Sequence, residues 1–151
     1  MPIYNSFLQR SMDGTIDLIA YAWTSGSHTS TDAVGDTIKC ALLTDAYIPD
    51  LGHATYADIE PYEMAEATGY VAGGQALTLT MAVDGQLSVS SNPTWAPLTG
   101  SLRYAVFYAD VTRNHIPKPL IGYIDLGAQT LVATKLTLRL GTLLTLALET
   151  Y

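Results

Sequence analysis

Seven short apolar segments, separated by Gly, Pro, Asn and Asp, constrain this chain more than any other feature of its sequence. Segments of this length and spacing are typical of β-strands joined by turns, because Gly and Pro interrupt longer regular elements. Seven such strands favour a mainly β fold, an antiparallel β-sandwich or jelly-roll-like domain. The expected strands span residues 37–44, 77–83, 86–90, 103–109, 120–126, 131–140 and 142–148.

The penultimate segment also shows which of its side chains face solvent. Leucines alternate there with polar residues: Leu136, Leu138 and Leu140 against Lys135, Thr137 and Arg139. An alternation of period two is typical of a strand with one face in the core and the other in water.

The register of one hairpin follows from the sequence. Leu79 and Met81 share one strand face, as do Leu87 and Val89 across the turn. A two-residue loop would place the two apolar faces on opposite sides of the ribbon. A three-residue loop at 83–85, with Gly left-handed at its end, sets Met81 against Leu87 and Leu79 against Val89. We therefore predict the three-residue loop.

A short helix is predicted before the strands, over about residues 3–12. Four apolar residues recur there at helical spacing: Tyr4, Phe7, Leu8 and Met12. Pro2 at the start and Asp13-Gly14 at the end are typical helix boundaries. Residues 24–36 are rich in Ser, Thr, Gly and Asp, which predicts a loop long enough to be mobile when unbound.

The composition indicates one folded domain spanning residues 1–151, because no repeat or charged linker divides the chain. Apolar residues make up 48% of the chain and charged residues only 14%, and so little surface charge suits a protein that a partner partly covers. No stretch approaches the roughly 20 apolar residues of a membrane span. The start lacks the features of a signal peptide, so we expect synthesis in the cytoplasm without Sec export. Cys40 is the only cysteine, and its apolar surroundings predict a buried thiol.

The net charge of −7 is unevenly distributed. Between Lys39 and Arg103 there is no Lys or Arg, yet that segment contains seven acidic residues: Asp45, Asp50, Asp58, Glu60, Glu63, Glu66 and Asp84. Nucleic-acid binding requires a clustered basic face, so a nucleic acid is excluded as the expected partner. A basic protein surface suits this segment better.

No catalytic, metal or cofactor site is predicted, and we expect a protein that is not an enzyme. His28, His53 and His115 lack the spacing of metal ligands and are predicted to be solvated loop residues. The acidic residues 58–66 do not match a calcium loop, and the chain lacks the tryptophans expected of a glycosidase cleft. The Gly-rich residues 69–74 carry no phosphate-binding signature, so they predict a turn with positive φ at Gly73 or Gly74.

Ten tyrosines against two phenylalanines suggest a protein that binds another protein, because tyrosine is favoured at interfaces. Four tyrosines fall in the acidic part of the chain, where they are candidate anchors. Tyrosines 104, 108 and 123 are instead expected to edge the core. The candidate interface residues are Tyr47, Tyr56, Asp58, Glu60, Tyr62, Glu63, Glu66 and Tyr70.

Several blocks of the sequence together resemble a known family. These are YNSFL at 4–8, DTIKCALLT at 36–44, AYIPD at 46–50, GYVAGGQAL at 69–77, Trp95, RYAVFY at 103–108 and PLIGYIDLG at 119–127. Their order and spacing are similar to a family of small virion structural proteins of tailed bacteriophages. The chain departs from that pattern in a longer segment at 16–36 and in its Leu-rich end, so oligomeric state and contact residues are not carried over.

The resemblance implies a decoration, or cement, protein on the exterior of the virion capsid. The implied partner is the major capsid protein. We also expect a homo-oligomer, with a trimer favoured, because subunits joined on three-fold axes raise each other's effective concentration at the shell. Two alternatives stay open: an adaptor associated with the tail, neck or fibre, and, from another class, a carbohydrate-binding β-sandwich module. The second alternative demands a row of exposed tryptophans, and the chain has only two in all.

Overall fold

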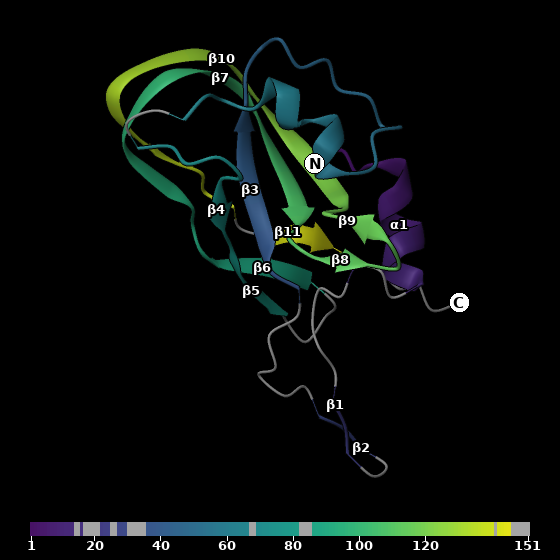
Figure 1. Cartoon of the computed structure of the whole chain (residues 1–151). Coiled ribbons are helices and arrows are strands. Elements are labelled where there is room, and N and C mark those ends of the chain that lie inside the picture. The colour runs from purple at the N-terminus through teal and green to yellow at the C-terminus, as the bar shows by residue number, and fades with distance from the viewer. Residues whose placement is uncertain are drawn as a thin grey trace.

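The computed structural model describes residues 1–13, 16, 22–24, 27–29, 36–66, 69–81, 86–140 and 142–145. The fold is mainly β, with antiparallel sheets and a short N-terminal helix, as predicted (Figure 1). Its elements are α1 (Asn5–Met12), β1 (Ala22–Thr24), β2 (Ser27–Thr29), β3 (Ile38–Leu43), η1 (Tyr56–Asp58), η2 (Glu60–Tyr62), β4 (Gln75–Ala76), β5 (Thr78–Met81), β6 (Gln86–Ser91), β7 (Thr94–Ala109), β8 (Thr112–Arg113), β9 (Ile116–Pro117), β10 (Leu120–Thr137) and β11 (Thr142–Thr145).

Two sheets form the body of the molecule. The main sheet has the order β10-β7-β3-β4, and the small sheet has the order β11-β6-β5. Two further pairs, β1 with β2 and β8 with β9, are short hairpins. Two antiparallel sheets of this kind are compatible with a sandwich, which stays a prediction.

Strand β3 and the second half of β7, residues 104–109, are buried on both faces of the main sheet, which explains why their sequences are almost continuously apolar. Successive residues of a strand point to opposite faces, so each strand contributes to two clusters. Cys40, Leu42 and Phe107 pack in one apolar cluster, which we call the inner cluster. Ala41 and Leu43 pack in a second cluster, which we call the tyrosine cluster. The tyrosine cluster is completed by Tyr4, Tyr47, Tyr56, Ile59, Tyr104, Val106, Tyr108 and Leu120.

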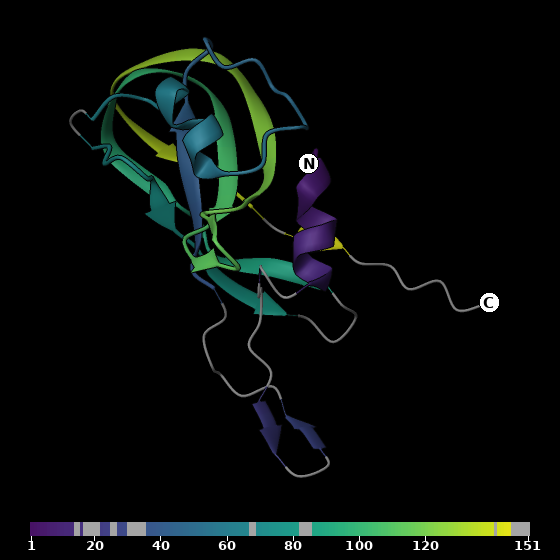
Figure 2. The same ribbon diagram turned by 45° about the vertical axis from the view of Figure 1, so that its right-hand side comes forward.

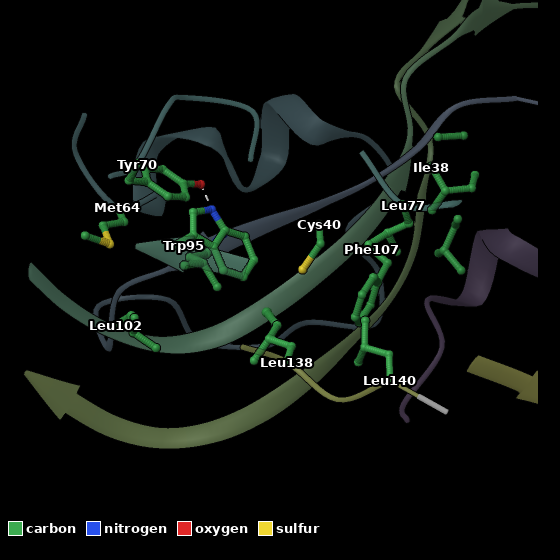
Figure 3. Close-up of a cluster of buried hydrophobic side chains, with 14 of the residues drawn as sticks. Ile38, Cys40, Met64, Tyr70, Leu77, Trp95, Leu102, Phe107, Leu138 and Leu140 are labelled. Atoms are coloured by element: carbon green, nitrogen blue, oxygen red, sulfur yellow. Dashed lines mark hydrogen bonds between the residues drawn. The ribbon is translucent and has the colours of Figure 1, made fainter. Parts of the chain in front are cut away.

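The long strands β7 and β10 arch over the inner cluster (Figures 1 and 2). The arch brings Trp95, which is 1% exposed, from the start of β7 onto the same core as Cys40 from β3 and Phe107 from the far end of β7 (Figure 3). Leu138 and Leu140 close the cluster from the other side. Cys40 is fully buried, as predicted, and burial raises the pKa of its thiol.

Two predicted strands, 120–126 and 131–140, are in fact one bulged strand, β10, which ends at Thr137. Its pairing with β7 shifts between Asp125 and Gln129, and Gly127 there adopts φ +75°. The extra residues loop out as a β-bulge, and the ladder resumes beyond them. Likewise, the strand predicted at 103–109 is only the second half of β7. The predicted alternation is confirmed and continues beyond the end of β10, since Leu138 and Leu140 are buried while Lys135 and Arg139 are exposed.

The predicted hairpin register is confirmed. Leu79 pairs with Val89 and Met81 pairs with Leu87 between β5 and β6. The three-residue loop itself, at 83–85, lies outside the described residues.

The predicted helix is confirmed as α1, whereas the loop predicted at 24–36 is wrong in part. Ser27–Thr29 forms β2 and pairs with Ala22–Thr24, with Trp23 opposite His28. Neither three-residue strand shows an alternation of apolar and polar residues, so no periodicity marked them. Both views place this hairpin away from the two sheets (Figures 1 and 2).

Candidate interaction surface

Three of the four candidate interface tyrosines are core residues. Tyr47, Tyr56 and Tyr70 are 1%, 6% and 3% exposed, so their rings are not available to a partner, and the prediction that they anchor one is wrong. Tyr47 and Tyr56 pack in the tyrosine cluster, and Tyr70 packs in the inner cluster. The ring centroids of Tyr56 and Tyr108 are 4.7 Å apart, and those of Tyr47 and Tyr104 are 5.5 Å apart.

The carboxylate of Glu63 binds the chain's own donors. It accepts hydrogen bonds from the hydroxyls of Tyr56 and Tyr70 and, at 2.7 Å, from the backbone N–H of Gly73. The Tyr70 hydroxyl in turn accepts the N–H of Leu42 at 3.0 Å, shown as the dashed line in Figure 3. Glu63 therefore ties η2, the Gly-rich turn and β3 together, and the expectation that it faces a partner is wrong.

Burial and the neighbouring carboxylate keep these tyrosines protonated. Burial raises the pKa of Tyr56 and Tyr70, and the hydrogen bond that each donates to Glu63 raises it further. A protonated hydroxyl is the form that donates to a carboxylate. The arrangement is a static hydrogen-bond network, suited to holding a fold.

Asp58 is exposed but caps the short helix η1. Its Oδ2 accepts the backbone N–H groups of Ala54 and Thr55, both at 2.9 Å, and completes a capping box with Thr55. Burial alone raises the pKa of Asp58, but these donors outweigh it, and the pKa lies below its usual range. The carboxylate therefore has a local structural role.

His53 is half-buried and hydrogen-bonded, so the prediction of a solvated loop histidine is wrong for this residue. Its Nδ1 lies 3.1 Å from the Tyr47 hydroxyl, which lies 2.9 Å from the Tyr4 hydroxyl. His115 is exposed, and the side chain of His28 lies outside the described part. These contacts join the loop after β3 to the N-terminal segment.

The Gly-rich turn after the acidic segment has the conformation that the sequence predicts. Gly73 and Gly74 adopt φ values of +86° and +69°. Gly74 lies directly against the backbone of Cys40 and Ala41 in β3. The Tyr108 hydroxyl donates to the Gly73 carbonyl oxygen at 2.8 Å, which fixes the turn on the tyrosine side of the sheet.

The remaining predicted interface residues do lie at the surface. Glu60 and Glu66 are exposed, and Tyr62 is 37% exposed, with its ring centroid 5.6 Å from that of Tyr47. The sequence did not predict the exposure of Ile48, which follows Tyr47 and is 80% exposed. An isoleucine is usually buried, so its residue type alone gave no sign of this exposure.

Basic side chains near the acidic segment are engaged with an acid of the main sheet. Lys39 Nζ lies 2.8 Å from Asp110 Oδ2, and Lys118 Nζ lies 3.7 Å from Asp110 Oδ1. The hydrogen bond from Lys39 and the charge of both lysines hold the pKa of Asp110 below its usual range. Within the described residues neither Glu60 nor Glu66 forms a salt bridge, whereas both lysines pair with Asp110.

Within the described residues, no group of three or more His, Cys, Asp or Glu side chains is arranged to hold a metal ion. No helix among them is long and apolar enough to span a membrane. Neither a protein-family model, nor a curated protein, nor a solved structure matches the chain.

Proposed function

We propose that this protein is a non-enzymatic virion structural protein that binds the outer surface of a tailed-phage capsid and stabilises the shell. The sequence resemblance supports the choice of family, and the exposed residues support the proposed mode of binding. The observation that carries the mode is the exposure of Glu60, Tyr62 and Glu66, which lie on a segment without Lys or Arg and which we call the shell-facing patch. Such a patch suits a basic area on the major capsid protein.

Stabilisation of the shell requires no chemistry. A subunit that binds the assembled lattice and not its dissociated pieces shifts the equilibrium toward the lattice by mass action. Subunits joined in a trimer would each raise the effective concentration of the others at the shell, so weak individual contacts suffice. The compact tyrosine cluster provides a rigid platform for such a contact, because its hydroxyls and rings are satisfied within the chain.

Removal of the two exposed charges is expected to weaken binding to particles. Glu60→Gln/Glu66→Gln should raise the dissociation constant for particles that lack the protein by roughly threefold to tenfold, since exposed ion pairs contribute about 0.2–1 kcal/mol each. The salt dependence of binding should decrease with it. Cosedimentation with such particles at several salt concentrations measures both quantities.

Thr78→Lys/Thr112→Lys provides a matched control, because these exposed threonines lie elsewhere and the change alters net charge equally. The control should bind almost as the unmodified protein does. Equal weakening by both variants would indicate a general charge effect, and unchanged binding by the glutamine variant would remove the shell-facing patch from the contact.

A further inference from the structure

Two exposed apolar side chains on the loop after β3 form the first of two complementary patches. Ile48 is 80% exposed and Leu51 is 40% exposed. Exposed apolar side chains that lie close together often mark a surface that binds a partner. Asp45 and Asp50 flank them, and both are exposed. We call these four residues the acidic patch.

The second patch lies on the end of β10 and the residues directly after it. Val132 is 74% exposed, and the exposed bases Lys135 and Arg139 follow it along the chain. Neither base forms a salt bridge within the part of the chain that the structure describes, in contrast to Lys39, Arg103 and Lys118. We call Val132, Lys135 and Arg139 the basic patch.

The two patches lie on different elements of the fold. The acidic patch follows β3 and adjoins Tyr47, whose ring packs in the tyrosine cluster. The basic patch lies toward the end of β10 and just beyond it, where Leu131, Leu138 and Leu140 pack in or against the inner cluster. Within the described residues no salt bridge joins the two patches, so each remains available to a second chain.

We infer that the acidic patch of one copy docks on the basic patch of a second copy. The patches match in kind, since each combines exposed apolar area with charge, and their charges are opposite. The contact joins different surfaces of the two copies, so it is heterologous and repeats until a ring closes. This inference deepens the proposed function by naming the surfaces of its oligomer, and it rests on that proposal for its role on the particle.

Sedimentation velocity of the purified full chain tests the contact without any particle. The unmodified protein should form a closed oligomer that dissociates as salt is raised. Lys135→Glu/Arg139→Glu should weaken association at least tenfold, and so should Asp45→Lys/Asp50→Lys. The four substitutions together should restore association, because the swapped charges are again opposite.

Restoration by the swap is the decisive result, because a variant that fails to fold cannot be rescued in this way. Ile48→Ser tests the apolar part separately: association should weaken roughly tenfold, while its salt dependence should stay unchanged. Circular dichroism should show that each variant keeps the β fold. A monomer under all conditions, or association that none of these variants alters, would overturn the inference.

Particle binding separates this inference from the proposed function. An oligomer that follows the charge swap but does not bind particles would leave the self-contact standing and remove the capsid role. A monomer that binds particles through Glu60 and Glu66 would do the reverse.

Discussion

Replacement of Gly74 by alanine should destabilise the protein by roughly 3–5 kcal/mol, in the range that marks an exceptional substitution. An added Cβ would lie 2.6 Å from the carbonyl carbon of Cys40 and 2.7 Å from Cα of Ala41, and closer still to the Cys40 carbonyl oxygen. These are backbone atoms of the central strand β3, which cannot move without disturbing both core clusters. Urea unfolding monitored by circular dichroism measures the change.

Gly127→Ala is the matched control. Gly127 also adopts a left-handed conformation, with φ +75°, but an added Cβ would have no neighbour within 4 Å. That variant should lose only about 1–2 kcal/mol of stability, which is the cost of placing a residue with a Cβ atom in the left-handed conformation. Equal losses at the two positions would contradict the close packing of the Gly-rich turn on β3.

Replacement of Glu63 by leucine should destabilise the protein by about 3 kcal/mol, because three donors lose their acceptor at once. The hydroxyls of Tyr56 and Tyr70 and the N–H of Gly73 all point to this carboxylate. Glu66→Leu provides the comparison, since that side chain is exposed and should change stability by no more than about 0.5 kcal/mol. Denaturant unfolding at neutral pH measures both.

A second substitution separates lost hydrogen bonds from lost packing. Tyr56→Phe removes one of the orphaned donors, so Glu63→Leu/Tyr56→Phe should cost less than the sum of the two single changes. Additive costs would show that the Tyr56 hydroxyl does not depend on Glu63. A neutral Glu63→Leu would instead return Glu63 to the set of partner-facing residues.

The strand pattern of the sequence predicted most of the β elements because apolar periodicity reports burial directly. The pairs Leu79–Val89 and Met81–Leu87 followed from the requirement that apolar faces coincide. The length of β10 did not follow, because Gly127 is typical of a turn, and only tertiary pairing with β7 keeps the chain in register beyond the bulge. Propensity alone does not distinguish a bulge from a loop.

The candidate surface was predicted only in part, for a reason that Tyr70 illustrates. Its sequence neighbours are glycines and acidic residues, which indicates an exposed loop, yet its ring is buried and its hydroxyl satisfies both Leu42 and Glu63. Local sequence does not reveal that a polar segment folds back onto a sheet and becomes part of its cover. Glu60 and Glu66 were predicted correctly as exposed, because the acidic, loop-like sequence around them indicates a solvated segment.

The measurement that tests the proposed role most directly is the number of copies of this protein in purified particles of its source phage, by quantitative mass spectrometry against the major capsid protein. We predict a fixed stoichiometry across the lattice, near one copy for each capsid subunit or a simple fraction of that number. A few copies in each particle would place the protein at the tail or neck, and its absence from the particle would contradict the structural role.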